Sequence, residues 1–296
     1  MRSISGIVPP ITTPFNEREE VDEAALRREV RYLVEEARVH GLAVGGSTGE
    51  GHTLSTEELR LVAAVALDEA QGRVPVIAGI IVDSTRQAIE RGEALSHLGV
   101  AALQVTPVHY LFRPDDDATY RHFATIADAT DIPVIIYNVV PWAYCSPELL
   151  VRIIDGVEGV VGVKQSAADM KLLADLLLMV GDRATIMSAV DALLYPSFCL
   201  GAHGAIAAIL TAVPALCVGL WEAVQAGDHG EALRLHGKLL PIWNAIAGDN
   251  LPANVKYAME LQGRLAGLPR SPMPASSRAQ RQAIQAALRS AGLVQS

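Results

Sequence analysis

The chain has 296 residues, of which half are hydrophobic, and its formal net charge at pH 7 is -9. An acidic chain of this kind is a poor partner for nucleic acid, because phosphate binding needs a basic surface. No apolar run reaches the ~20 residues of a membrane span, and the segment before Pro9 lacks the apolar stretch of a signal peptide. We therefore expect a soluble cytoplasmic protein, without membrane contact, that binds small metabolites.

Short apolar runs rich in β-branched residues alternate along the chain with longer amphipathic segments. The runs predict eight strands, at residues 6–11, 42–46, 74–80, 101–106, 133–138, 160–165, 184–189 and 204–209. The amphipathic segments predict helices at residues 22–39, 55–70, 85–98, 116–129, 147–154, 169–180, 191–199 and 214–225. The helix at 55–70 starts with Ser55 and has Glu58 three residues on, which is the spacing of a capping box.

Strands that each precede a helix predict an α/β fold, namely a (β/α)8 TIM barrel, which typically takes ~250 residues. An open doubly wound sheet is disfavoured because no Gly-x-Gly-x-x-Gly follows the first strand. Beyond residue 225 the strand pattern stops, and helices are predicted at 231–247, 252–266 and 276–292. We therefore divide the chain into a catalytic barrel, residues 1–224, and a C-terminal helical extension, residues 225–296.

Neither disulfide nor metal chemistry is indicated. The three cysteines are far apart and form no Cys-x-x-Cys pair, so no disulfide framework is predicted. The eight histidines show no His-Glu-x-x-His, so we predict no metal site and expect no cofactor.

In a barrel the reactive side chains gather at the carboxyl ends of the strands. Lys164, one of four lysines in the chain, directly follows the apolar run 160–163. A partly desolvated amine in this position favours its uncharged form and becomes a usable nucleophile. Tyr137 lies near the end of the preceding strand, so its phenol is expected at the same mouth of the barrel, where it is a candidate proton shuttle.

The second strand runs into the sequence Gly-Gly-Ser-Thr-Gly-Glu-Gly at residues 45–51. The glycines permit positive φ, and the exposed N–H groups together with the hydroxyls of Ser47 and Thr48 can hold a small anion. A phosphate is disfavoured because the Walker pattern is absent and Glu50 would repel a dianion. A monocarboxylate is the better fit.

The three strand ends together resemble, in order and spacing, those of the dihydrodipicolinate synthase and N-acetylneuraminate lyase family, at residues 46–50, 137–138 and 162–164. The resemblance runs nearly end to end, with further matches at residues 9–15, 106–107, 200–206 and 255–258. It implies a (β/α)8 barrel with a C-terminal helical extension that assembles as a homotetramer, a dimer of dimers. It also implies a Schiff base with pyruvate or a related 2-oxo acid, and an aldehyde co-substrate.

The resemblance implies roles for the matching residues. Lys164 would attack the 2-oxo carbon to form an iminium, and Tyr137 would move protons to and from the substrate. Ser47 and Thr48 would bind the carboxylate of the 2-oxo acid, with Gly49 in the same anion-binding turn. Ser47 would also relay the proton.

Further pocket positions follow from the resemblance. Ile206 would line the pocket near the pyruvyl group. A second tyrosine often joins the proton relay, sometimes across a subunit interface; Tyr110 is the candidate, and His109 is the alternative for its place. Lys256 is assigned to the helical extension rather than to catalysis.

One departure from the family pattern bears on the second substrate. The synthase carries an arginine shortly after the tyrosine, where it holds the carboxylate of aspartate semialdehyde. Trp142 stands there in this chain, so that clamp is lost unless Arg113 reaches in from the neighbouring loop. Ser166 and Asp191 could hydrogen-bond a polyhydroxylated substrate, whereas Trp142 would favour an aromatic or alkyl aldehyde.

The sequence therefore predicts a lyase of the class I aldolase type, an aldolase or dehydratase acting on pyruvate or a related 2-oxo acid through a Lys164 iminium. A 4-hydroxy-tetrahydrodipicolinate synthase, which joins pyruvate to aspartate semialdehyde, is the alternative within the family. A catalytically idle barrel that binds 2-oxo acids is the competing class. The enzyme is favoured, because an idle barrel needs no amine, phenol and hydroxyl pair at three separate strand ends.

Overall fold

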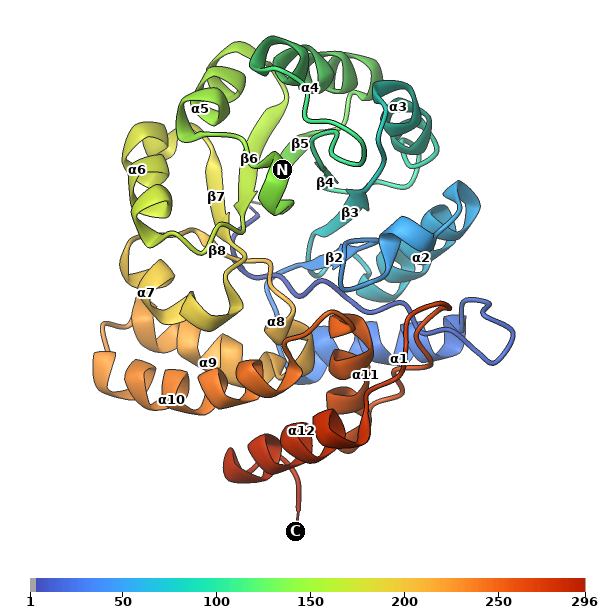
Figure 1. The fold of residues 1–296 in the computed structure, drawn as a ribbon, viewed down its shortest axis with the longest axis vertical. Coiled ribbons are helices and arrows are strands. Elements are labelled where there is room, and N and C mark those ends of the chain that lie inside the picture. Colours follow the sequence, from blue (N-terminus) through green and yellow to red (C-terminus); the bar gives the residue numbers. More distant parts are fainter. Residues whose placement is uncertain (1–3, 296) are drawn as a thin grey trace.

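One parallel sheet of eight strands forms the centre of the fold, in the order β1-β8-β7-β6-β5-β4-β3-β2. The computed structural model describes residues 4–295, so residues 1–3 and 296 of the two predicted domains lie outside it. The strands are β1 (Gly6–Ile7), β2 (Leu42–Val44), β3 (Val76–Ile80), β4 (Ala102–Val105), β5 (Val134–Asn138), β6 (Val160–Gln165), β7 (Thr185–Ser188) and β8 (Gly204–Ala205). Figure 1 shows the sheet curled, with helices arranged around it.

The chain after β1 lies beside β2, the strand at the other edge of the sheet. Pro10 and Ala43 form a parallel bridge, in which Ile11 N donates to Ala43 O (2.8 Å) and Ala43 N donates to Pro9 O (3.0 Å). Eight parallel strands that curl round in this way, with helices between them, are consistent with the predicted (β/α)8 barrel.

Helices alternate with the strands, and they begin where the sequence supplies caps. They are α1 (Glu23–Arg31), α2 (Thr56–Ala70), α3 (Thr85–Glu93), α4 (Asp116–Thr130), α5 (Pro147–Gly156), α6 (Met170–Val180), α7 (Leu194–Cys199), α8 (Ile209–Ala212) and α9 (Pro214–Gln225). The predicted capping box of α2 is confirmed, since Ser55 Oγ accepts from Glu58 N (3.1 Å) and Glu58 Oε2 accepts from Ser55 N (2.9 Å).

The first and last predicted strands are too long. The strand expected at 6–11 shrinks to β1, because Pro9 and Pro10 have no N–H to donate to a neighbouring strand. The strand expected at 204–209 ends at Ala205, and Ile209 already starts the short helix α8.

The helix predicted at 22–39 is not one continuous α-helix. It consists of α1 and a wider π-helical turn, Tyr32–Glu36, because Ala37 N donates to Tyr32 O, five residues back (2.9 Å).

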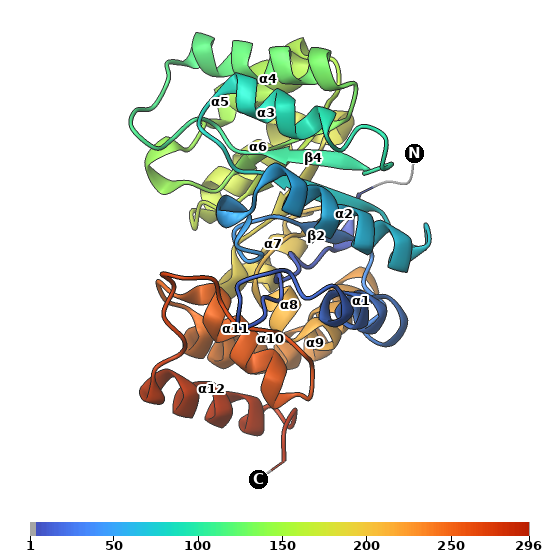
Figure 2. The ribbon, with the colours of Figure 1, turned by 90° about the vertical axis from the view of Figure 1, so that its right-hand side faces the viewer.

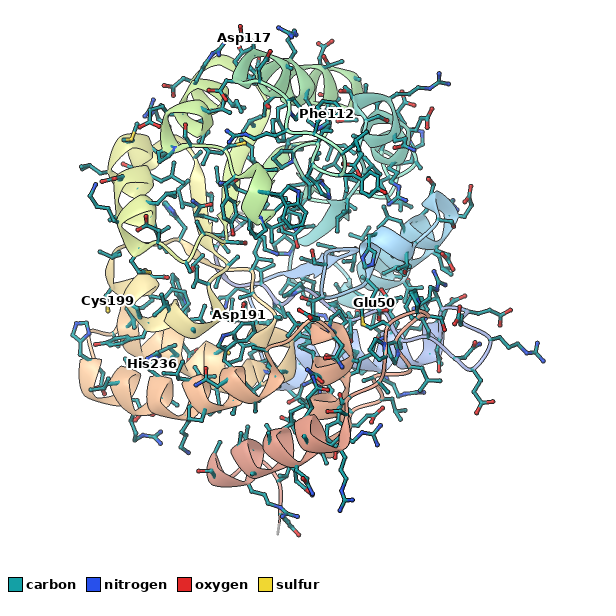
Figure 3. All side chains as sticks on the ribbon, in the orientation of Figure 1. Glu50, Phe112, Asp117, Asp191, Cys199 and His236 are labelled. Atoms are coloured by element: carbon teal, nitrogen blue, oxygen red, sulfur yellow. The ribbon has the colours of Figure 1, made fainter. Side chains whose placement is uncertain are left out.

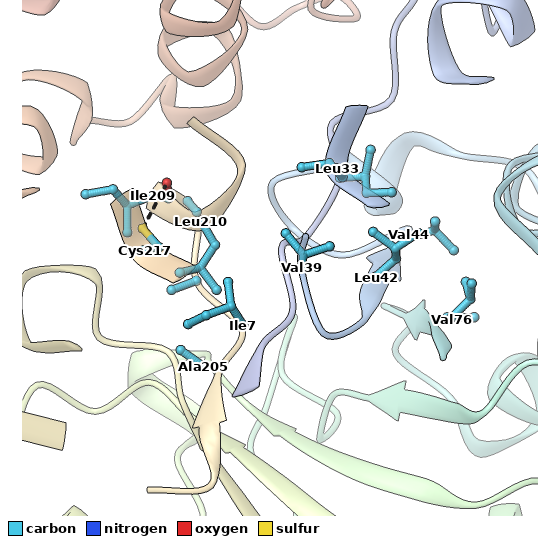
Figure 4. Close-up of a cluster of buried hydrophobic side chains, with 14 of the residues drawn as sticks. Ile7, Leu33, Val39, Leu42, Val44, Val76, Ala205, Ile209, Leu210 and Cys217 are labelled. Atoms are coloured by element: carbon cyan, nitrogen blue, oxygen red, sulfur yellow. Dashed lines mark hydrogen bonds between the residues drawn. The ribbon is translucent and has the colours of Figure 1, made fainter. Parts of the chain in front are cut away.

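Apolar side chains of the strands are buried on both faces of the sheet. One set points into the interior of the curled sheet and forms an inner cluster that includes Val8, Ala43, Ile77, Ala102, Ile135, Met187 and Ile206. The other set packs against the helices, and Figure 4 shows part of it, including Ile7, Leu42, Val44, Leu33 and Ile209. Burial on both faces explains why the strands read as nearly continuous apolar runs.

Three helices form the C-terminal part: α10 (His229–Ile246), α11 (Leu251–Leu261) and α12 (Arg278–Ser290). α10 packs on α9 and α12, and α11 packs on α8 and α12, so these helices gather at one end of the molecule in Figure 2. Two buried ion pairs, Arg264 with Glu29 and Lys256 with Glu50, join this part to the first fifth of the chain. Among residues 4–295, no helix combines the length and apolar character needed to cross a membrane.

Candidate active site

Three reactive side chains from different elements meet inside the curled sheet. Tyr137 on β5 and Lys164 on β6 are partners in register, and Lys164 Nζ lies 4.1 Å from the centre of the Tyr137 ring. The hydroxyl of Tyr137 lies 2.9 Å from Ser47 Oγ and accepts a hydrogen bond from Ser47 N (3.3 Å). Tyr137 and Lys164 are only 1% and 4% exposed, so the amine and the phenol share a largely dry environment.

The surroundings of Tyr137 favour the loss of its proton. Burial alone would raise the pKa of this phenol, but the charge of Lys164 and the hydrogen bonds with Ser47 together lower it by more. The pKa of Tyr137 therefore lies below its ordinary value. A phenol of this kind can give a proton to a substrate and take one back.

The segment between β2 and α2 is folded so tightly that it depends on glycine. A Cβ at Gly51 would lie 1.8 Å from Gly45 O, so no other residue fits there. Gly49 N and Gly51 N both donate to Gly46 O, at 3.0 Å each. Within residues 4–295 the N–H and the hydroxyl of Thr48 have no hydrogen-bond partner, so they are available to an anion.

Glu50, the acidic residue of this segment, is bound to the C-terminal part. It has a left-handed backbone conformation, with φ 55°, and its side chain is fully buried. Its Oε1 accepts from Lys256 Nζ (2.7 Å) and its Oε2 accepts from Arg270 N (2.9 Å). The repulsion that Glu50 would exert on a bound anion is therefore offset by a buried lysine from α11.

A cavity of about 510 Å³ opens beside Ser47 and Thr48. Its other lining residues are His52, Ile81, Thr106, His109, Val139, Val140, Asp249, Leu251, Pro252 and Met273. Lys164 and Tyr137 are not among them, and Ser47 connects the cavity to the Tyr137 hydroxyl. Among the residues described, no arginine or lysine lines this cavity.

Three of the predicted substrate-binding residues lie near Lys164 in the fold. Ser166 follows β6, and its buried hydroxyl has no partner among the described residues. Asp191, after β7, accepts a hydrogen bond from the first residue of α8 (2.7 Å). Burial raises the pKa of the Asp191 carboxyl to about 6, although this hydrogen bond and the charge of Lys164 oppose the rise. Ile206 packs in the inner cluster with Met187, the register partner of Lys164.

The loop between β4 and α4 is largely exposed. Tyr110 has 81% of its surface exposed and Phe112 has 63%, and Figure 3 shows Phe112 well away from Asp191. His109 lines the cavity, and its carbonyl accepts from Trp142 Nε1 (3.0 Å). Trp142 is itself 68% exposed, so it lies at the rim of the cavity rather than inside it.

Some polar residues near the site were missed by sequence reasoning. Gln104 on β4 is fully buried, and neither polar atom of its amide has a partner among the described residues. A glutamine inside the apolar run 101–105 was a signal that could have found it. Asp249 and His52 reach the cavity from segments that carry no local signal. No group of three or more His, Cys, Asp or Glu side chains within residues 4–295 is placed to hold a metal ion.

A parallel β/α fold with a buried lysine, a tyrosine and a serine meeting at its strand ends is the arrangement of an enzyme, a lyase of the class I aldolase type. The model of the Dihydrodipicolinate synthetase family matches residues 3–291, so the chain belongs to this family. The resemblance read from the sequence is thereby confirmed.

Individual relatives agree with the assignment. A 4-hydroxy-tetrahydrodipicolinate synthase of Thermomicrobium roseum is 38% identical over 290 residues, which cover 97% of this chain and 94% of that protein. The dihydrodipicolinate synthase of Acinetobacter baumannii, solved in complex with pyruvate, has a TM-score of 0.92 at 28% identity, covering 99% of this chain and 100% of that chain. The N-acetylneuraminate lyase of Fusobacterium nucleatum has a TM-score of 0.89 at 27% identity, covering 98% and 99%.

Proposed function

We propose that the protein is a Schiff-base-forming lyase or aldolase that acts on pyruvate or a related 2-oxo acid through Lys164. The observation that carries this proposal is the position of Lys164 Nζ, 4.1 Å from the centre of the Tyr137 ring, whose hydroxyl is hydrogen-bonded to Ser47. A nucleophile, a proton shuttle and a relay thus lie together. The relative from Acinetobacter baumannii, solved with pyruvate, supports the choice of a 2-oxo acid.

Each step of the reaction has a group to perform it. The uncharged Lys164 amine adds to the 2-oxo carbon, and the oxygen of the carbinolamine leaves as water after Tyr137 has delivered a proton. The iminium then withdraws electrons, so that loss of a C3 proton, or cleavage of the bond from C3 to C4, gives an enamine. Ser47 passes protons between Tyr137 and the cavity.

Thr48 is the main carboxylate-binding residue in this proposal, because its N–H and its hydroxyl are both unpaired within residues 4–295. Ser47 supplies a second hydroxyl next to it. Gly49 N already donates to Gly46 O, and Gly49 O accepts from Thr13 Oγ1 (2.6 Å), so Gly49 acts by shaping the turn. The pairing of Glu50 with Lys256 keeps the site receptive to an anion.

The acceptor that the cavity favours is an uncharged aldehyde. No arginine or lysine among the described residues lines the cavity, and Arg113 lies 3.8 Å from Asp116 instead. The second carboxylate of aspartate semialdehyde therefore has no cationic partner there. Ser166 and Asp191 are the candidate polar contacts of the acceptor, with Trp142 at the rim.

The second candidate function is 4-hydroxy-tetrahydrodipicolinate synthase, which the names of the relatives at 38% and 34% identity favour. A substrate screen separates the two. Pyruvate is offered with aspartate semialdehyde and, separately, with uncharged alkyl, aromatic and hydroxylated aldehydes, and products are followed by NMR. We expect turnover with an uncharged aldehyde; a clear preference for aspartate semialdehyde would decide for the synthase.

Borohydride reduction in the presence of pyruvate tests the Schiff base directly. We expect one reduced pyruvyl adduct, located by mass spectrometry on the peptide that contains Lys164. The adduct should disappear in Lys164→Ala and persist in Lys171→Ala, which alters a lysine whose side chain is 77% exposed on α6. An adduct that survives Lys164→Ala would contradict the proposal.

A homotetramer, built as a dimer of dimers, is the assembly we propose. Tyr110, Leu111 and Phe112 are 81%, 85% and 63% exposed, and such an apolar loop is stabilised when a second subunit covers it. Tyr110 would then serve the site of a neighbouring subunit. Light scattering of the wild type and of Leu111→Asp tests the assembly, and a monomeric wild type would contradict it. The cytoplasmic location and the domain boundary at residues 224–225 stay predictions.

A further inference from the structure

Gln104 is a polar side chain in an otherwise apolar interior. On β4 it is the register partner of Gly79 on β3 and of Ile135 on β5. Register partners on neighbouring parallel strands face the same side of the sheet, and Ile135 belongs to the inner cluster. Gln104 therefore points into the curled sheet, where it is 0% exposed.

The amide of Gln104 and the hydroxyl of Tyr137 both lie beside Gly46. A Cβ built on Gly46 would be 3.8 Å from Gln104 Nε2 and 3.7 Å from Tyr137 OH. The next residue, Ser47, already donates its backbone N–H to the same hydroxyl (3.3 Å). Gln104 Nε2 and the Tyr137 oxygen with its partner Ser47 are thus grouped around Gly46.

Neither Nε2 nor Oε1 of Gln104 has a hydrogen-bond partner within residues 4–295. A buried amide without a partner is unfavourable, and an apolar side chain of the same size would avoid that penalty. The amide is therefore expected to find its partner in another state of the site. Tyr137, whose oxygen lies beside the same glycine, is a group whose hydrogen-bonding capacity changes during the proposed reaction.

We propose that Gln104 is a positioning residue for Tyr137: its amide nitrogen donates a hydrogen bond to the Tyr137 oxygen once that oxygen has given up its proton. This inference rests on the proposed role of Tyr137 as proton shuttle. The phenol exchanges a hydrogen bond with Ser47 Oγ, accepts from Ser47 N and interacts with Lys164. The phenolate only accepts, so it can take a further donor once the Lys164 nitrogen is bonded to the substrate carbon. Gln104 itself neither gains nor loses a proton.

The charged groups around Tyr137 explain why a neutral donor is useful. Lys164 on β6 stands over the ring, and Asp191 after β7 interacts electrostatically with Lys164. Lys164 must lose its proton before it can attack the 2-oxo carbon, so its charge is missing at that stage. The Gln104 amide is a donor at every stage, so it can bind the phenolate whether the Lys164 nitrogen is an ammonium, an amine or an iminium.

Pyruvate alone in D₂O provides an assay that does not depend on the aldehyde. Exchange of the methyl protons proceeds through the enamine and is followed by NMR. Gln104→Met keeps the length of the side chain but removes its donor. We expect the kcat of exchange to fall about 10- to 100-fold, with the KM for pyruvate changed less than about two-fold. The pH at which Tyr137 ionises in the rate profile should rise by about one unit.

A double-mutant cycle with Tyr137→Phe tests the route. In the Tyr137→Phe background, Gln104→Met should have no further effect, because its effect runs through the missing oxygen. The matched control is Gln165→Met. Gln165 is also a buried glutamine, 1% exposed. It follows Lys164 on β6 and therefore faces the other side of the sheet, where its side-chain oxygen accepts from Asn138 (2.9 Å). The effect of Gln165→Met should therefore be the same in both backgrounds.

An equal loss from Gln104→Met in both backgrounds would mean that Gln104 acts on the substrate or on the fold, and would overturn the inference. An unchanged exchange rate in the single variant would overturn it too. Gln104→Leu takes the place of Gln104→Met if the latter does not fold. Borohydride trapping of the wild type separates the two proposals: without a pyruvyl adduct on Lys164 the proposed function fails, whereas an adduct with additive effects of Gln104 and Tyr137 removes this inference alone.

Discussion

Two lysines are buried in this protein, and the partners of their amines differ. Lys164 and Lys256 are 4% and 1% exposed, and each stands over an aromatic ring, at 4.1 Å from the centre of Tyr137 and 4.8 Å from that of Phe15. Lys256 donates to a buried carboxylate of Glu50 (2.7 Å), while Lys164 has no ion pair among residues 4–295.

We propose that this difference separates a structural amine from a reactive one. Lys256 also donates to Leu268 O (2.6 Å), so two of its three hydrogens are engaged and its charge is matched by Glu50. Lys164 contacts the phenol ring of Tyr137 and has no carboxylate partner among residues 4–295. It lies near the end of a strand and close to a cavity. Burial alone therefore does not distinguish the two lysines, whereas the partners of their amines do.

The largest effect is expected from Lys164→Met. Removal of the amine should reduce methyl-proton exchange of pyruvate to the rate without enzyme, because no iminium can form. Stability should change little, since the variant removes a buried amine that no carboxylate balances. NMR of pyruvate in D₂O and urea unfolding measure the two effects. Exchange at the wild-type rate would remove the distinction between the two lysines.

A loss of stability rather than of chemistry is expected from Lys256→Met. The variant leaves Glu50, 0% exposed, buried without its partner, which should lower the free energy of unfolding by about 3 to 5 kcal/mol. The KM for pyruvate should also rise, because the unpaired charge lies two residues from Thr48. Both effects are measured on the full-length chain, by urea unfolding and by the exchange assay.

Two control variants accompany Lys256→Met. Adding Glu50→Gln should restore part of the lost stability, because the uncompensated charge is then gone. Lys171→Met breaks the exposed pair with Asp175 and should cost less than about 1 kcal/mol. Similar losses from Lys171→Met and Lys256→Met would show that the buried pair is not special.

The two lysines also mark how far sequence reasoning reaches in the site. The meeting of Lys164, Tyr137 and Ser47 could be predicted because each lies at or just after the end of a strand, and parallel strands bring these ends together. The partner of Lys256 could not, since Glu50 is 206 residues away along the chain and no periodic pattern connects them. Gln104 was hidden for a related reason, because its significance depends on what the fold places around it.

The fold shows the same division between features that the local sequence predicts and features that depend on residues far away in the chain. Helix α2 starts where Ser55 and Glu58 predict, because a capping box is local, and α9 has the bounds predicted for it, Pro214–Gln225. The first and last strands were predicted too long: β1 ends before Pro9 and Pro10, which have no N–H to donate, and β8 pairs with β1 over two residues. A capping box sets the start of α2 by itself, whereas the length of β8 depends also on a partner strand distant in sequence.

A smaller effect is expected from Asp191, the carboxylate that influences Lys164 without pairing with it. Its folded pKa is about 6, against an ordinary value of 3.8, so between about pH 4 and 6 the folded state binds more protons than the unfolded state. The contribution of Asp191 to stability therefore falls as the pH rises through this window, by at most about 3 kcal/mol.

Asp191→Asn keeps an oxygen acceptor for Ile209 N but cannot ionise. Relative to the wild type it should be more stable at about pH 8 and gain little at about pH 4, as urea unfolding at both values will show. If the free energies of unfolding of the two proteins change with pH in parallel, burial does not disfavour the charged form of Asp191. Asp191 would then act as a counter-ion of Lys164.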